Sequence, residues 1–311
     1  KIYKKQQRWD EEIKMLYQAI EVNSQQMLER PFYINNQKIS TIGEAAKIEL
    51  EYISGQLFNQ AVDYINSIPE NNAIDKEGYA KLNGLYDLCI LADSDNPLFY
   101  ISKYVLFSEQ NKSDACYNIL QKGLAAIPNS ADLNAIMGDF VDQPIEKESY
   151  FKNAIKYATS DNKEKVVGWE NSLVIAVYNQ NKIDEAIALS NQLIDKYPDD
   201  PNNYFNVGLF YYNLAQEQQN NGVEPYNQII SDNYKKDELN KLILSCYNSF
   251  KKSREYIDTS IDFLLQASDL EIEEKNDISN NLKNTRLFKK RLNDVYINSI
   301  REIARKQDIK L

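Results

Sequence analysis

The sequence predicts an all-α protein built from a row of paired helices. It has only 9 glycines and 8 prolines in 311 residues, which are too few turn residues for a sheet of many strands. Apolar residues recur at helical spacing over most of the chain. Two prolines that end such stretches, Pro128 and Pro198, are 70 residues apart. This distance fits two periods of about 34 residues, so we expect an array of helical hairpins.

The first 95 residues are expected to form N-terminal helices. Residues 3–29 carry an apolar face at helical spacing, and residues 75–92 do the same. Between them, residues 41–67 are predicted to form a helical hairpin that is hinged near Gly55. A polar loop is expected before this hairpin, and its turn-forming residues are Pro31, Asn35 and Asn36.

The clearest repeats lie in residues 96–268. Asn96 before Pro97 gives an N-cap followed by a proline in the first helical turn, and Asp200 before Pro201 repeats this signal. The second helix of the first repeat has apolar or small residues at helical spacing, namely Cys116, Ile119, Leu120, Gly123, Leu124 and Ile127. In the helix from Pro201, Gly208 leaves room on the apolar face for a neighbouring helix to come close.

Residues 216–240 depart from the repeat. They separate the helix that begins at Pro201 from an apolar pattern that starts at Cys246. We expect an insertion that lengthens both helices and includes a loop around Gly222 and Pro225. The insertion is either a solvated projecting hairpin or a binding segment, since insertions in repeat proteins often carry binding.

Residues 269–311 are expected to form a long C-terminal helix that caps the array, because a terminal repeat exposes an unfinished core. Residues 283–311 carry nine lysines and arginines against three carboxylates, whereas the whole chain has a net charge of -10. A basic amphipathic helix can dock on an anionic membrane or on an acidic partner. The alternative is that this helix packs on the chain's own acidic remainder and closes the core.

The helix from Pro201 resembles the first helix of a tetratricopeptide repeat (TPR), whose pattern runs W-x2-L-G-x2-Y, then A-x3-F, then P. The matching residues here are Tyr204, Val207, Gly208 and Tyr211. The resemblance covers about residues 97–268 and extends in a degenerate form to residues 39–95. It implies a right-handed α-solenoid whose concave inner surface, lined mainly by the first helix of each hairpin, receives a peptide.

The resemblance also implies which residues line that groove, namely those one helical position off the buried seam. They are Ile101, Val105, Asp139, Glu170, Val174, Phe205, Asn206, Leu209 and Tyr212. The set is mixed apolar and acidic or neutral, and it lacks the basic trio with which some TPR proteins clamp a carboxylate tail. We therefore expect an apolar or basic protein or peptide as the partner.

Several kinds of chemistry are excluded by composition. The chain contains no histidine, which removes histidine-dependent triads, His-Glu zinc peptidases and histidine-ligated iron. It also lacks both common phosphate-binding glycine loops. Cys89, Cys116 and Cys246 are widely spaced within apolar patterns, so we expect buried thiols. No catalytic residue, metal ligand or cofactor is predicted, and the negative net charge argues against nucleic-acid binding.

We therefore expect a non-catalytic scaffold that binds a protein or peptide partner in its concave groove. The first alternative is a structural or envelope-associated assembly subunit that acts through its ends and its basic C-terminal helix. The second is an enzyme with an unrecognised carboxylate or tyrosine site. No apolar run is long enough to span a membrane, so membrane contact is expected only through the C-terminal helix.

The sequence begins at Lys1 without an initiator methionine. Processing of a leader would explain this, so we expect an extracytoplasmic bacterial setting, either the periplasm or an association with the outer membrane. A trimmed cytoplasmic chain would look the same.

Overall fold

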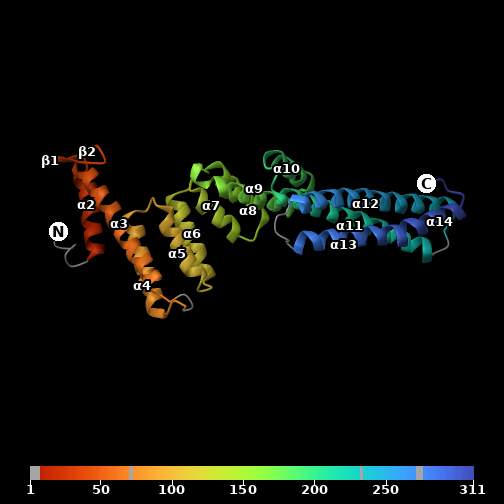
Figure 1. The fold of residues 1–311 in the computed structure, drawn as a ribbon, viewed down its shortest axis with the longest axis horizontal. Helices are drawn as coiled ribbons and strands as arrows, with labels where there is room; N and C mark the ends of the chain where they lie inside the picture. The colour runs from red at the N-terminus through yellow and green to blue at the C-terminus, as the bar shows by residue number, and fades with distance from the viewer. Residues whose placement is uncertain (1–7, 70–72, 232–233, 271–275) are drawn as a thin grey trace. The chain divides into compact units, whose positions relative to one another are not determined.

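The computed structural model describes residues 8–69, 73–231, 234–270 and 276–311, and α-helices make up most of them (Figure 1). The predicted all-α fold of successive helical hairpins, with a long helical segment closing the C-terminal end, is confirmed. The chain divides into two compact units, Lys1–Trp169 (unit 1) and Glu170–Leu311 (unit 2).

Unit 1 is a row of helices in which each helix from α2 to α8 contacts the next, and it also carries a short β-hairpin. Its elements are α2 (Trp9–Asn23), β1 (Met27–Ile34), β2 (Gln37–Thr41), α3 (Ile42–Asn66), α4 (Lys76–Ala92), α5 (Pro97–Ser108), α6 (Ser113–Ala126), α7 (Ala131–Phe140), α8 (Pro144–Lys156), a 3-10 turn (Ser160–Asn162) and the start of α9 (Lys163–Tyr178).

Side-chain caps fix where several of these helices begin. The Asn96 side chain accepts a hydrogen bond of 3.1 Å from the backbone N–H of Leu98, directly after Pro97 at the first helical position. Ser130 caps α7 in the same way. Such caps satisfy backbone N–H groups that have no partner inside the helix.

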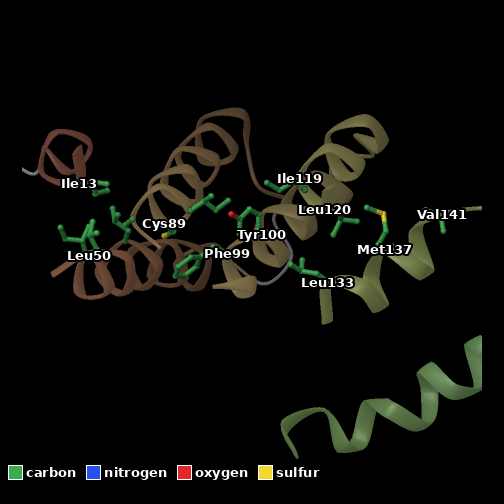
Figure 2. Close-up of a cluster of buried hydrophobic side chains, with 14 residues drawn as sticks. Ile13, Leu50, Cys89, Phe99, Tyr100, Ile119, Leu120, Leu133, Met137 and Val141 are labelled. Atoms are coloured by element: carbon green, nitrogen blue, oxygen red, sulfur yellow. The ribbon is translucent and has the colours of Figure 1, made fainter. Parts of the chain in front are cut away.

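One apolar core runs through unit 1 from α2 to α7 (Figure 2). Tyr100, Leu120 and Met137 are almost completely buried within it. Gly123 faces this core, because a β-carbon at that position would lie 3.0 Å from the Tyr100 ring and 3.1 Å from Leu133. The predicted burial of Cys89 and Cys116 is confirmed, and both are free thiols.

Residues 27–41 form an antiparallel β-hairpin, so the predictions of a helix up to residue 29 and of a loop after it were wrong. Ile34 pairs with Gln37, and Asn35 and Asn36 between them have φ angles of 47° and 65°. Two successive positive φ angles are what a two-residue hairpin turn requires, and asparagine tolerates them. Pro31 lies within β1, in the irregular part of the ladder between Met27 and Phe32. Residues 3–7 lie outside the described residues.

Residues 42–66 form one continuous helix, so the predicted hairpin hinged at Gly55 was also wrong. Glycine weakens a helix by only about 1 kcal/mol, and the buried stripe of Leu50, Ile53 and Leu57 continues across it. The antiparallel partner of α3 is α4 instead.

Unit 2 combines one ordinary helical pair with three much longer helical segments. Its elements are the rest of α9, α10 (Ile183–Lys196), α11 (Pro201–Ser231), α12 (Lys236–Leu270), α13 (Asn276–Arg291), the π-helix η2 (Leu292–Ile297) and α14 (Asn298–Lys306). A small core joins α9, α10 and the start of α11. Within it the rings of Tyr178 and Phe210 stack with centroids 4.2 Å apart.

The segment at 216–240 continues α11 and begins α12. The expected loop around Gly222 and Pro225 was wrong, because both residues lie inside α11. A β-carbon at Gly222 would lie 2.6 Å from the ring of Phe250 on α12, so the two helices are in close contact there.

The C-terminal segment completes a second core in unit 2. Leu292, Ile297 and Ile300 are buried together with Phe250 and Cys246, and Val223, Tyr226 and Ile229 of α11 pack against them. The inserted segment therefore packs one apolar side against the C-terminal segment, whereas Ile230 on it is 61% exposed. Figure 1 shows α13 and α14 running along α12. The acidic residues at 271–275 lie outside the described residues.

Candidate binding cleft

A cleft of about 370 Å³ opens on unit 1 between α5, α7 and the first turns of α9. These are the first helices of successive hairpins. The residues that line the cleft are Pro97, Leu98, Ile101, Asp132, Ala135, Ile136, Asp139, Lys165 and Trp169.

The floor of the cleft is apolar. Ile101 and Ile136 are half-buried against the unit 1 core, and Trp169 is almost fully buried. Leu98 projects from the first turn of α5 and is 46% exposed. An exposed leucine beside a concave apolar floor supplies a surface on which the apolar side chain of a ligand can be buried.

One end of the cleft is closed by a polar network. The carboxylate of Asp132 accepts a hydrogen bond of 2.8 Å from the Lys165 ammonium and one of 3.2 Å from the Asn162 amide. Asn162 itself is buried. The carboxylate of Asp132 is therefore already neutralised, and its role is to hold the start of α9 against α7.

The carboxylate of Asp139 stands in a different environment at the rim. Within the described part of the chain it forms no ion pair or side-chain hydrogen bond, and the residue as a whole is exposed while its carboxylate is partly shielded from solvent. Partial burial of the carboxylate raises its pKa, and the positive charge of Lys147 opposes this effect. Lys147 directs its ammonium to the backbone carbonyls of Gly138 and Asp139, each at 3.4 Å. Asp139 thus has no direct hydrogen bond or ion pair among the described residues, and a ligand cation can approach its carboxylate alongside the more distant Lys147.

The structure brings together two of the predicted groove residues of unit 1. Ile101 and Asp139 both line the cleft. Val105, one helical turn beyond Ile101, is 47% exposed but lies outside the lining. The sequence reasoning missed Leu98 and Trp169 as lining residues.

In unit 2, three predicted groove residues are already engaged within the chain. Val174 is 1% exposed and belongs to the core formed with α10 and α11, so its assignment to a groove surface was wrong. Glu170 accepts a hydrogen bond of 2.7 Å from Lys196, and this contact raises the pKa of the lysine. The amide of Asn206 donates a hydrogen bond of 3.1 Å to the side-chain oxygen of Asn171.

The remaining predicted residues lie on α11. The ring of Tyr212 packs edge-on against Phe288 of α13, with centroids 5.6 Å apart. A segment of the same chain therefore covers a side chain that was expected to meet a ligand. Phe205 and Leu209 are half-buried.

The described residues show no other centre of reactive groups. They contain no group of three or more cysteine, aspartate or glutamate side chains that is placed to hold a metal ion. Burial raises the pKa of the Cys89 and Cys246 thiols to about 12, so neither is a nucleophile at neutral pH. No helix in the described part of the chain is both long and apolar enough to cross a bilayer.

No family model matches the sequence, and no curated protein matches it. Among solved structures the chain is similar to PilW, described as a type IV pilus biogenesis factor, with 12% identity over 80% of this chain and 98% of that one and a TM-score of 0.39. It is also similar to PilF of Pseudomonas aeruginosa, with 10% identity over 82% of this chain and 99% of that one and a TM-score of 0.38. For YrrB, described as a TPR protein with an unusual peptide-binding site, the identity is 16% over 62% of this chain and 83% of that one, with a TM-score of 0.39. At these identities and TM-scores the likeness carries no argument about function.

Proposed function

We propose that this protein is a non-catalytic TPR-like scaffold that binds a peptide segment of a protein partner in the cleft between α5, α7 and α9. The observation that carries the proposal is the apolar floor of a preformed cleft of about 370 Å³. A preformed cleft lowers the entropic cost of binding, because the surface is already ordered.

The chemistry of the cleft supports a ligand that joins an apolar side chain to a cation. Ile101, Ile136 and Leu98 offer apolar area, and the carboxylate of Asp139 at the rim forms no ion pair or side-chain hydrogen bond among the described residues. A lysine or arginine of the ligand would neutralise that charge in a partly dehydrated place, where an ion pair is stronger than in open water. This agrees with the expectation of an apolar or basic partner.

A photo-crosslinking experiment in the native host tests the proposal. A photoreactive amino acid at position 98 samples the cleft, and the same residue at position 145 on α8 is the matched control, since Ile145 is 67% exposed and lies outside the lining. We expect a discrete crosslinked protein from position 98 that is absent from position 145. The change Asp139→Lys should remove that product.

Equal crosslinking from both positions, or no product from position 98, would contradict the proposal. The captured partner also gives a peptide for direct binding. Leu98→Glu is then expected to weaken its affinity at least about tenfold, because it places a charge at the mouth of an apolar cleft, while Ile145→Glu leaves the affinity unchanged.

A further inference from the structure

A basic stripe lies on the solvent side of α13, separate from the cleft of unit 1. It consists of Lys283, Arg286, Lys290 and Arg291, all of which are exposed. Within the described part of the chain none of the four forms an ion pair, whereas their neighbour Lys289 is paired with Asp258 at 2.5 Å. In a chain with net charge -10, four cations on one helix without an ion pair among the described residues form a distinct surface.

One apolar side chain lies within this stripe, and a second lies one turn beyond it on η2, next to the exposed Asp294. Leu287, between Lys283 and Lys290, is 56% exposed, and Val295 is 46% exposed. An α-helix returns to the same face after about seven residues, and the π-helix η2 adds about one residue to this repeat. Leu287 and Val295, eight residues apart, therefore face solvent together, while Leu292 between them is buried.

We propose that this stripe is a docking surface for an acidic amphipathic helix of a partner protein. The pattern of an apolar seam flanked by charges is that of a helix–helix interface, in which the flanking charges select the partner. Charge complementarity identifies the occupant, because glutamates beside the apolar seam of the partner would neutralise the four cations that have no ion pair among the described residues.

A membrane surface fits the stripe less well. An interfacial helix inserts a broad apolar face, but the apolar face of α13 and η2 is already used, since Leu282, Leu292 and Ile297 are buried in unit 2. Leu287 and Val295 alone offer little area to a bilayer. Two exposed apolar side chains about two helical turns apart, one of them flanked by cations, match the contact of a second helix better.

The test uses a fluorescein-labelled acidic helix of about 20 residues, the length of α13 with one extra turn. Its seam positions are leucine and its flanking positions glutamate. We expect the purified full chain to bind this peptide in fluorescence anisotropy at 50 mM NaCl and to bind it more weakly at 300 mM. The double change Lys283→Glu and Lys290→Glu is expected to weaken binding at least about tenfold.

The matched control is Lys241→Glu with Lys251→Glu, two exposed lysines of α12, which alters the net charge equally. It should leave peptide affinity unchanged, and circular dichroism should show both variants folded. The proposal is overturned if the peptide fails to bind or if both double variants bind it equally. It is also overturned if the protein binds vesicles containing phosphatidylserine through the stripe but does not bind the peptide.

A second copy of this chain is the remaining occupant to test. The proposal is overturned if ultracentrifugation shows a dimer formed through the stripe that the peptide does not dissociate.

Discussion

The hydroxyl of Ser260 donates a hydrogen bond of 2.7 Å to the backbone carbonyl of Gly208, which lies 52 residues earlier in the chain. Both residues are fully buried where α11 and α12 meet. Seven residues before Ser260, Ser253 donates a bond of 2.6 Å to the carbonyl of Ala215 in the same way. The two helices are therefore joined by side chain–backbone bonds that require small residues at the contact.

The first prediction concerns these two serines. Ser260→Ala should lower the free energy of unfolding of unit 2 by about 1 kcal/mol, the usual net value of one hydrogen bond. Ser253→Ala should cost a similar amount. Because the two sites are about 10 Å apart along the helix, the double variant should lose the sum of both. Urea titration followed by circular dichroism measures the change, and a double variant as stable as either single variant would contradict it.

A second prediction contrasts two glycines inside helices. A β-carbon at Gly208 would lie 2.8 Å from the side chain of buried Leu264, whereas one at Gly55 would meet nothing within 4 Å. Gly208→Val should therefore destabilise unit 2 by about 2 kcal/mol through overpacking. Gly55→Ala should stabilise unit 1 by about 0.5–1 kcal/mol, because alanine is the better helix former.

The midpoint of each unit in urea measures both changes. Equal effects of the two substitutions would show that helix propensity, and not helix contact, decides stability at Gly208.

A third prediction concerns Asp139 and pH. Burial raises the pKa of this carboxyl in the folded protein, so the folded state favours its protonated form. The ionised form therefore costs stability, and this cost appears as the pH rises through the folded pKa. Asp139→Asn should raise the melting temperature slightly at pH 7 and leave it unchanged near pH 3, where the carboxyl is protonated in both states. Calorimetry at the two pH values measures this, and Asp132→Asn, which breaks an ion pair, should lower the melting temperature at pH 7 instead.

A fourth prediction follows from the second core of unit 2. Deletion of residues 277–311 removes Leu292, Ile297 and Ile300 and uncovers Phe250. Each large apolar side chain exposed in this way costs about 1.5–3 kcal/mol, so α11 and α12 should lose their fixed packing. We expect increased binding of an apolar dye and rapid proteolysis within 216–250. A truncated chain with unchanged protease resistance would contradict this.

The parts of the fold that follow from local chemistry could be predicted from the sequence. Asn96 before Pro97 marks a helix start because both the cap and the proline act within one turn. The small residue at Gly208 predicts close helix contact, and Leu264 fills that space. Helical periodicity also gave the correct burial of all three cysteines.

Other parts of the fold depend on contacts between residues that are far apart in the sequence, which a local pattern of residues does not contain. Gly55 was interpreted as a hinge, because a glycine in a helix and a glycine in a turn look alike until the partner helix is known. The hairpin at Asn35 and Asn36 had a local signal, since paired asparagines between apolar residues favour a two-residue turn, but the helical interpretation of its flanks concealed it. Tyr212 could not be assigned correctly, since its contact with Phe288 joins segments 76 residues apart.

The joint burial of Phe250 with Ile300 also constrains the order in which unit 2 can form. Phe250 is synthesised fifty residues before Ile300. The long pair of α11 and α12 therefore leaves the ribosome with its apolar side at Phe250 exposed, because the segment that covers it has not yet been made. The buried residues of the described core of unit 1 all lie within residues 13–141. Unit 1 can therefore fold while the rest of the chain is still being synthesised. During synthesis this apolar side of α11 and α12 is therefore exposed until the C-terminal segment follows, and slower translation between the two residues would lengthen that exposure.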